Sequence, residues 1–499
     1  MAKTIGVLFL VLIFMTGVTA AQDARSVLQA ASTAMGAANL RSVQYSGTGW
    51  NAAFGQAYSP ADDWPRFEVT SYTRTIDYDS KSLKEETIRR QGNYLQRGGG
   101  GTPIQGEQRQ NAFGSGGFAW SLNEQKMPNP QPNAAEMRQL EILLTPHGFL
   151  KEALKSEAKA FSVPLGGRNG TIVSFTALGK YRVNGTINDQ NLVERVQTWV
   201  TTPLLGDTIH QTNYTEYKDF AGIKFPTRIH QHYGDTHQAN AAHHTLDITV
   251  TSVQPNVTGA ALTVPDNVRQ AKPEPVRVTP QRISDGVWYL LSGNQSSMLV
   301  EFNDFSVVVE APGNEERSLA AIAEVKKLLP NKPIRYLVNT HHHFDHSGGL
   351  RTFVAEGSTI VTHERNREYF ERVLFSRATR TMEPDRLSMY PRNPTFETVR
   401  EKYTISDGTK IMDIHFVPGL AHNENMLVAY LPKEKIVFQG DLWNPPAPGG
   451  PPGTAGPSQK TFYQNAQRLK LDIATVVPVH GGRTGVWSDF MRMQGLTQK

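Results

Sequence analysis

The sequence predicts an α+β protein in which a mostly antiparallel β domain precedes a domain of alternating strands and helices. Up to residue 275, β-branched and aromatic residues recur in alternating runs that are separated by Gly, Asn and Asp. This pattern is typical of strands with one buried face. After residue 282, short apolar strand patterns alternate with helical patterns. At 499 residues the chain is also too long for one ordinary core, which favours two domains.

The N-terminus has the pattern of a signal peptide, which we assign to residues 1–20. Lys3 precedes an apolar run over 5–18, and Val18-Thr19-Ala20 offers small residues for cleavage. The run is shorter than the ~20 residues of a membrane helix, so a retained anchor is the less favoured alternative. No comparable run follows and the chain has no Cys. We therefore expect a secreted or periplasmic protein with no stable membrane span.

Residues 21–275 are predicted to form the β-rich domain. Helices are expected over 22–40 and 140–160, a flexible loop at Gly98–Gly101, and a turn at Asn184-Gly185. The alternating pattern predicts strands over 70–78, 171–176, 181–187, 196–201, 208–217 and 246–253. The segment 217–229 resembles the curved sheets of bacterial lipoprotein-carrier half-barrels, and this resemblance implies no chemistry.

Histidines also cluster in this domain, at His230, His232, His237, His243 and His244. Two of them, His230 and His232, would share a strand face, which makes a metal site one interpretation. No carboxylate lies in a comparable ligand pattern, and turn residues surround the cluster. The sequence therefore favours a surface hairpin that is rich in His.

A polar stretch punctuated by Pro265, Pro273, Pro275 and Pro280 lacks any periodicity, so we place the domain boundary there. The second domain would span residues 276–499. Its first half is predicted to contain strands over 287–291, 298–302, 306–310 and 334–338, and a helix over 317–329.

The motif His341-x-His343-x-Asp345-His346 brings four metal-ligand side chains into six residues. An apolar run precedes it and Ser347-Gly348-Gly349 opens a helical pattern after it, so the ligands would lie on a strand-to-helix loop. Imidazole and carboxylate suit zinc and related divalent ions. Because so short a segment cannot wrap four ligands around one ion, the spacing suggests two neighbouring ions.

Three residues further along the chain would complete this site. His422 follows the run 417–421, Asp441 ends the run 436–440, and His480 ends the run 476–479. Each lies where a predicted strand ends, so one edge of a sheet could gather all the ligands.

In this order, the seven residues resemble the ligand set of the metallo-β-lactamase superfamily. The resemblance implies an αββα sandwich with the site at one edge of its two sheets. It implies that one metal ion binds His341, His343 and His422, that a second binds Asp345, His346 and His480, and that Asp441 bridges them.

The resemblance further implies a dinuclear zinc hydrolase, with Fe or Mn as alternative metals. Two ions ~3.5–4 Å apart can share a hydroxide that is nucleophilic at neutral pH. Asp345 and Asp441 are the candidate catalytic residues, Asp345 by orienting that hydroxide. The bond cleaved would be an ester, lactone, amide (including a β-lactam) or phosphoester. Asn425, with Asn423, is a candidate substrate-binding donor to an oxyanion.

Two other functions fit the same sequence. A single iron on this ligand framework would make an oxygenase that acts on persulfides. Alternatively, the N-terminal sheet would bind lipid or another apolar ligand, and the metal domain would be ancillary. In each case we expect a small-molecule ligand and no nucleic acid, because the formal charge of +5 includes no Lys/Arg block. The pattern does not indicate an oligomeric state.

Several further residues have weaker assignments. His342 is expected beside the metals or in solvent, whereas His363 and His415 are expected to be structural. The loop 445–457 is expected to border the pocket because it follows Asp441 closely. Charge alone makes Arg377, Arg380 and Arg483 candidates for anchoring an anionic substrate.

Overall fold

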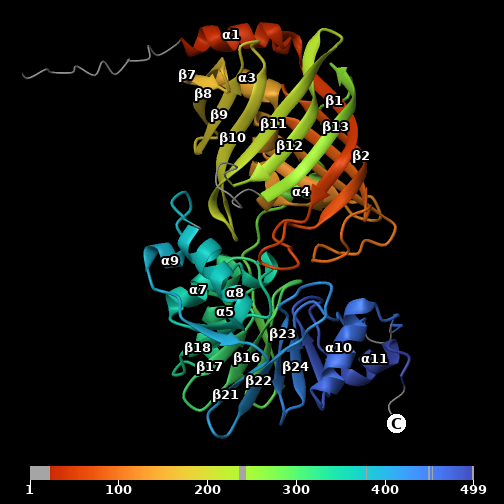
Figure 1. Cartoon of the computed structure of the whole chain (residues 1–499), viewed down its shortest axis with the longest axis vertical. Helices are drawn as coiled ribbons and strands as arrows, with labels where there is room; N and C mark the ends of the chain where they lie inside the picture. The colour runs from red at the N-terminus through yellow and green to blue at the C-terminus, as the bar shows by residue number, and fades with distance from the viewer. Residues whose placement is uncertain (1–22, 235–242, 378, 448–449, 452, 497–499) are drawn as a thin grey trace, which may run out of the picture.

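The computed structural model describes residues 23–234, 243–377, 379–447, 450–451 and 453–496. The predicted signal peptide and His237 lie outside these residues. Within the described ranges, no helix combines the length and the apolar character that crossing a membrane requires. The chain forms an N-terminal part built on one large sheet and a C-terminal part built on two smaller ones (Figure 1).

The N-terminal part confirms the predicted β-rich domain. Its described strands form one 13-stranded sheet in the order β6-β5-β4-β3-β2-β1-β13-β12-β11-β10-β9-β8-β7, and the paired strands run antiparallel. The strands are β1 (Ser42–Ala52), β2 (Arg66–Asp77), β3 (Ser82–Arg90), β4 (Glu107–Ser115), β5 (Phe118–Leu122), β6 (Pro128–Pro130), β7 (Lys159–Leu165), β8 (Arg168–Ala177), β9 (Tyr181–Ile187), β10 (Val193–Thr202), β11 (Gly206–Phe220), β12 (Ile223–Tyr233) and β13 (His243–Pro255).

Three helices cover the apolar face of this sheet: α1 (Ala24–Ala34), α2 (Ala135–Leu143) and α3 (Pro146–Ala153). Leu28, Leu140 and Phe149 of these helices are buried in its core. The resemblance of segment 217–229 to lipoprotein carriers stays a prediction.

Two local predictions in this part are wrong. The helix expected over 140–160 is broken, because Thr145 caps α3, Pro146 occupies its first position, and β7 begins at Lys159. The turn expected at Asn184-Gly185 lies inside β9 instead. A Cβ at Gly185 would lie 2.1 Å from Cζ of Phe149, so this Gly serves the close packing of α3 on the sheet.

The C-terminal part contains a seven-stranded and a six-stranded sheet. The first comprises β14 (Thr279–Ser284), β15 (Val287–Leu291), β16 (Ser297–Glu301), β17 (Ser306–Val309), β18 (Ile334–Val338), β19 (Thr359–His363) and β20 (Phe396–Val399). The second comprises β21 (Lys402–Ser406), β22 (Ile411–Phe416), β23 (Leu427–Leu431), β24 (Ile436–Gln439), β25 (Thr475–Pro478) and β26 (Gly485–Val486). The predicted domain boundary, at residues 275 and 276, falls between β13 and β14 and stays a prediction.

Four layers are recognisable from the cores, which confirms the αββα sandwich. Val300, Val338 and Phe438 belong to the apolar core between the two sheets. Helices α5 (Glu315–Leu328) and α7 (Leu350–Glu356) pack on the outer face of the first sheet. Helices α10 (Pro457–Arg468) and α11 (Trp487–Met493) pack on the outer face of the second. The chain also contains the short helices α4 (Asp266–Gln270), α6 (Phe344–Ser347), α8 (Glu364–Tyr369) and α9 (Arg386–Met389), the 3₁₀ helices Ala37–Asn39 and Pro132–Ala134, and the π-helix Phe370–Arg377.

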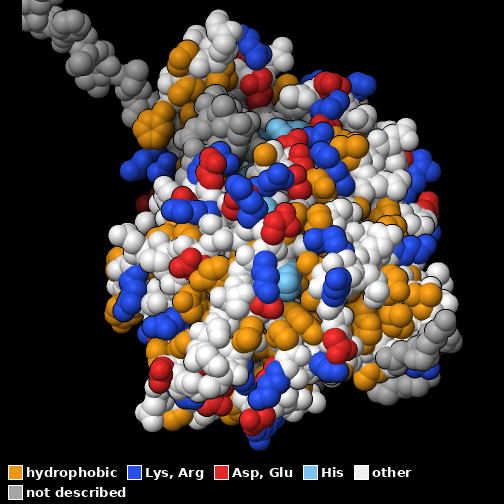
Figure 2. Space-filling model, turned by 60° about the horizontal axis from the view of Figure 1, so that its bottom comes forward, with side chains coloured by type: hydrophobic (Ala, Val, Ile, Leu, Met, Phe, Trp, Pro, Cys, Tyr) orange, Lys and Arg blue, Asp and Glu red, His pale blue; other side chains and the backbone are white. Residues whose placement is uncertain are grey.

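Charged side chains of both signs are mixed over the face that Figure 2 shows, where Lys and Arg lie among Asp and Glu. This view contains no broad field of one sign. The expectation of no nucleic-acid partner stays a prediction.

Arg380 fastens the two parts together. Its guanidinium donates to the carbonyl oxygens of Thr202 and Pro203, each at 2.6 Å, and its Nε lies 3.2 Å from Asp385. Beside it, Asp207 accepts hydrogen bonds from Thr381 Oγ1 at 2.8 Å and from the Met382 amide at 3.1 Å. Arg380 is therefore a structural clamp, which contradicts its assignment as a candidate anion anchor.

We expect Arg380→Ala to lower the free energy of unfolding by about 3 kcal/mol, because it removes a buried charge-assisted contact and leaves one buried and one part-buried carbonyl without their donor. Urea unfolding of the full chain measures this. The exposed Arg372→Ala is the control and should change stability by less than about 0.5 kcal/mol. Equal stability of the two variants would contradict the clamp.

Candidate metal centre

The predicted ligand residues meet at one edge of the sandwich. The segment His341–His346 follows β18, and His422 lies in the loop between β22 and β23. Asp441 follows β24 and His480 follows β25, and these two strands are parallel neighbours. Because these four connections lie at the same edge of the sandwich, the fold brings together side chains that are far apart in sequence.

The side chains form two donor groups that share one carboxylate. One group is His341, His343, His422 and Asp441, and the other is Asp345, His346, His480 and Asp441. In each group, ligand atoms from all members lie within 4.8 Å of one another. The grouping matches the division that the sequence resemblance implied.

Asp441 presents one oxygen to each group. Its Oδ2 lies 2.9 Å from Nε2 of His422 and 3.9 Å from Nε2 of His341. Its Oδ1 lies 2.9 Å from Nε2 of His346 and 3.2 Å from Nε2 of His480. This is the geometry expected of a carboxylate that bridges two cations.

The donor atoms fit metal ions better than they fit one another. Nε2 of His346 and Oδ1 of Asp441 are buried and make no well-aligned hydrogen bond, although they are close. In the first group, Nε2 of His341 lies 2.9 Å from Nδ1 of His343 and 3.4 Å from Nε2 of His422. Three imidazole nitrogens that converge in this way are a donor set that suits a divalent metal ion.

Hydrogen bonds on the far side of the rings select which nitrogen faces the centre. The carbonyl oxygens of Ala57 and Asn294 each lie 2.8 Å from a ring nitrogen, Nε2 of His343 and Nδ1 of His480. A carbonyl can only accept, so these two ring nitrogens carry protons, and the opposite nitrogens, Nδ1 of His343 and Nε2 of His480, are the ones that face the centre. Such outer partners orient metal-binding histidines.

Glu310 performs the same task for His346. It is fully buried, and its Oε2 lies 3.1 Å from Nδ1 of His346. The carboxylate also accepts from the Thr340 amide at 3.1 Å and from the Asn339 side chain at 3.2 Å. The sequence alone did not identify Glu310. This residue follows β17, which helix α5 separates from the ligand motif along the chain, and it belongs to no motif itself.

At part of the centre, the pKa shifts favour the protonation states that metal binding requires, a neutral imidazole and an ionised carboxylate. Burial, reinforced by the neighbouring imidazoles, lowers the pKa of His341 well below its usual value, so the ring is neutral. Burial raises the pKa of Asp441, but His346 and His422 outweigh it and hold the carboxyl ionised. Burial also lowers the pKa of His480, whereas Asp345 and Asp441 raise it to about 10. A bound cation would replace that proton as the partner of the two carboxylates.

Loops of the N-terminal domain close over this centre. Gln56 donates from Nε2 to Oδ1 of Asp345 at 2.7 Å and accepts through Oε1 from the Gly100 amide at 3.1 Å. The Gly98 amide donates to the carbonyl of Ala421 at 2.8 Å. A Cβ at Gly99 would lie 2.9 Å from Cε1 of His343, so only Gly allows this approach. The loop predicted to be flexible is thus held against the ligands.

A pocket of about 490 Å³ opens beside the donor groups. The N-terminal domain lines it with Ala53, Phe54, Gln56, Gly100 and Gly101, and the C-terminal domain lines it with Phe344, Asp345, His422 and Asp441. The described residues of the loop 445–457, which was expected to border the pocket, are not among these. The domain of unassigned role therefore supplies much of the wall.

Other predicted residues lie behind the centre. Asn425 is fully buried and donates to Asn366 at 3.2 Å, so its placement does not support a substrate contact. Asn423 Nδ2 lies 3.1 Å from Nδ1 of buried His342, which places both beside the ligand loop.

The remaining candidates have structural surroundings. Nδ1 of His363 accepts from the Arg365 amide and caps α8, and His415 is buried on β22. Arg483 donates to the carbonyl of Pro446 at 3.1 Å. The side chain of Arg377 lies outside the described residues.

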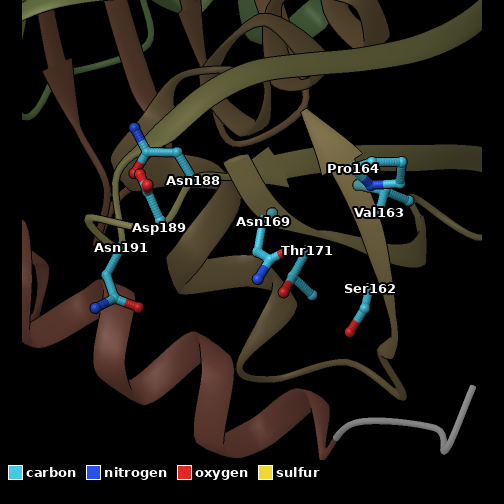
Figure 3. Close-up of a pocket in the computed structure, with 9 residues that line it drawn as sticks. Ser162, Val163, Pro164, Asn169, Thr171, Asn188, Asp189 and Asn191 are labelled. Carbon is cyan, nitrogen blue, oxygen red and sulfur yellow. The ribbon is translucent and has the colours of Figure 1, made fainter. Parts of the chain in front are cut away.

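A second hollow, at the far end of the N-terminal sheet, has a different character. Asn169 and Thr171 of β8 face it, and Asn188, Asp189 and Asn191 line it from the turn between β9 and β10 (Figure 3). Amides and hydroxyls dominate this lining, and none of the predicted ligands belongs to it.

Comparison with known proteins bears on the C-terminal domain. Residues 292–480 match the family model of the metallo-beta-lactamase superfamily. A curated relative, 2,4-dinitroanisole O-demethylase subunit alpha of Nocardioides sp. (strain JS1661), is 25% identical over 171 residues. This match covers 34% of the present chain and 45% of the relative, so the chain spans less than half of that protein.

Solved structures match the same part of the chain. A metallo-beta-lactamase from Pontibacter korlensis is 20% identical, with a TM-score of 0.35, over 44% of this chain and 98% of that one. The mono-zinc form of the metallo-beta-lactamase FIM-1 from Pseudomonas aeruginosa is 23% identical, with a TM-score of 0.34, over 45% of this chain and 97% of that one.

Proposed function

We propose that this chain, whose residues 292–480 form a metallo-beta-lactamase superfamily domain, is a hydrolase that works with two divalent ions, zinc first among them. The domain is of a metal-dependent hydrolase type. The observation that carries the proposal is Asp441, whose two oxygens face two separate groups of imidazole nitrogens. A single-ion centre would not need this second complete set of donors.

The chain's own residues have distinct tasks in this proposal. His341, His343 and His422 hold one ion, and His346, His480 and Asp345 hold the other. Two ions bound there supply a nucleophile from water at neutral pH and a Lewis acid for the substrate. Asp345 orients the attacking water, while Gln56 fixes the carboxylate of Asp345 from outside.

The pocket indicates the kind of substrate. Phe54 and Phe344 provide an aromatic wall, with their ring centroids 5.3 Å apart. Among the described residues that line the pocket there is no Lys or Arg to pair with an anionic group. We therefore propose a small neutral substrate with an apolar substituent that carries an ester, lactone or amide bond, and we expect phosphodiesters to be poorer substrates.

A substrate panel on the full chain tests this proposal. The panel contains a nitrophenyl ester, a lactone, a chromogenic cephalosporin, a phosphodiester and 2,4-dinitroanisole, an aryl ether chosen because of the curated relative's name. We expect ester or lactone hydrolysis that dialysis against a chelator abolishes and Zn²⁺ restores. Hydrolysis that survives complete metal removal would contradict the proposal. A content of one iron per chain, together with oxygen uptake when persulfides are added, would instead support the oxygenase alternative.

We also propose export of the mature protein, on the sequence of residues 1–20 alone. N-terminal sequencing of the protein from the producing cell tests this. A mature N-terminus near Ala21 is expected, and an intact Met1 would contradict export.

A further inference from the structure

The histidines at the end of β12 and the start of β13 converge rather than spread over a surface hairpin. One ring nitrogen from each of His230, His232 and His244 lies within 4.8 Å of the other two. His232 is only 1% exposed, so the expectation of a surface cluster fails there. An irregularity in the pairing of the two strands, between Gln231 and His232, sets His232 opposite His244.

The spacing of these nitrogens resembles that of the metal centre described above. Nε2 of His230 lies 2.8 Å from Nδ1 of His244, compared with 2.9 Å between the paired nitrogens of His341 and His343. Ring centroids in the cluster are 4.9 Å apart for His230 and His244, and 5.9 Å apart for His232 and His244. Small movements of side chains would bring the nitrogens to the roughly 3.3 Å separation that tetrahedral zinc with bonds of about 2.0–2.1 Å imposes.

A carboxylate orients the first of these rings. Oδ2 of Asp247 lies 2.9 Å from Nδ1 of His230, which leaves Nε2 to face the other two imidazoles with its lone pair. Arg228 lies 2.9 Å from each oxygen of the same carboxylate and holds it in place. Asp247 is directly opposite His230 across the two strands, and so the sheet register builds this pair. A carboxylate–histidine pair of this kind is the usual outer support of a metal ligand.

We propose that His230, His232 and His244 bind a third divalent transition-metal ion, of the zinc type, in the N-terminal domain. Three neutral imidazoles and no bound carboxylate leave one coordination position open to water or a small ligand. Burial, with the neighbouring His230, lowers the pKa of His244, which favours the neutral ring that a metal requires. The ion would join β12 to β13 beside Tyr233, whose ring packs on Phe54 of the pocket wall.

Equilibrium dialysis of the full chain against Zn²⁺, followed by elemental mass spectrometry, tests this site. We expect three zinc ions in the wild type and two in His244→Ala. The matched control is His243→Ala, because the ring of His243 stacks on Trp64 instead, at 4.4 Å between centroids, and its loss should leave three ions. Equal zinc content in the wild type and His244→Ala would overturn the proposal.

A conservative variant distinguishes the loss of one metal site from a general loss of folding. Asp247→Asn keeps the shape of the side chain and removes the charge that orients His230. We expect it to keep three ions at saturating zinc but to weaken one of them about 10–100-fold. Unchanged affinity for all three ions in Asp247→Asn would contradict the assignment of His230 as a metal ligand that Asp247 orients.

The test is independent of the proposed hydrolase function. A chain that carries His341→Ala, His346→Ala and Asp441→Ala keeps only two donors in each group of the proposed hydrolase centre. It should still bind one ion, which the further change His244→Ala should abolish. Retention of one ion in the first chain and none in the second supports the third site even if no hydrolysis is found. Loss of all zinc from the first chain would overturn it.

Discussion

Asp441→Ala is expected to bind at most one zinc ion at the centre and to lose at least about 10³-fold in kcat/KM. The carboxylate is shared, so its removal takes a ligand from both donor groups at once. It also leaves the imidazoles of His422 and His346 without the charge that faces them at 2.9 Å. A bound metal ion stabilises the transition state by several kcal/mol, and each 1.36 kcal/mol is a factor of ten in rate.

Zinc content and kcat/KM are measured together, in a His244→Ala background so that only this centre is counted. The control is Asp472→Ala, which removes an aspartate that is 72% exposed and pairs with Lys435. It should keep two ions and full activity. If Asp441→Ala also kept both, the bridging assignment would be wrong.

Gln56→Ala should lower kcat/KM about 10–100-fold, the usual cost of losing an outer partner of a metal ligand. Its side chain is the link between the N-terminal domain and Asp345. Without it, Oδ1 of Asp345 loses a donor at 2.7 Å and the Gly100 amide loses its acceptor. We expect kcat to fall, because Asp345 is no longer fixed, and zinc affinity to fall with it.

Two comparisons separate positioning from a structural role. Gln44→Ala removes an amide of the same domain that donates to Thr75 at 2.8 Å, away from the centre, and should leave kcat unchanged. Gln56→Leu keeps most of the volume without the amide and should be as impaired as Gln56→Ala. Normal kcat in Gln56→Leu, with only stability reduced, would show that the side chain merely fills space.

Local patterns in the sequence point to the residues that the fold brings together at the candidate centre. Four of the residues share one short motif, Asp441 and His480 come just after apolar strands, and His422 lies in the loop after another strand. Strands β9, β15 and β18 have the bounds that their alternating or apolar runs predicted. In these three strands, the residues that form the strand also carry the pattern from which it was predicted.

The parts that sequence reasoning missed depend on contacts between distant segments. Gln56 and Ala57 reach Asp345 and His343 across more than 280 positions, and neither residue belongs to a ligand motif. Glu310 orients His346 from a fully buried position. The sequence pattern does not show that these two side chains meet. Asn184-Gly185 has turn composition, yet the packing of Phe149 on the sheet decides its conformation. The His230 cluster needed the register of β12 and β13 before its rings could be seen to meet.

Anomalous scattering at the zinc absorption edge, measured on crystals of the zinc-loaded chain, tests the central claim most directly. Two peaks are expected at the edge of the sandwich, one on each side of the Asp441 carboxylate. The first should be next to His341, His343 and His422, and the second next to Asp345, His346 and His480. A single peak there, or none, would contradict the two-ion centre on which the proposed hydrolase rests.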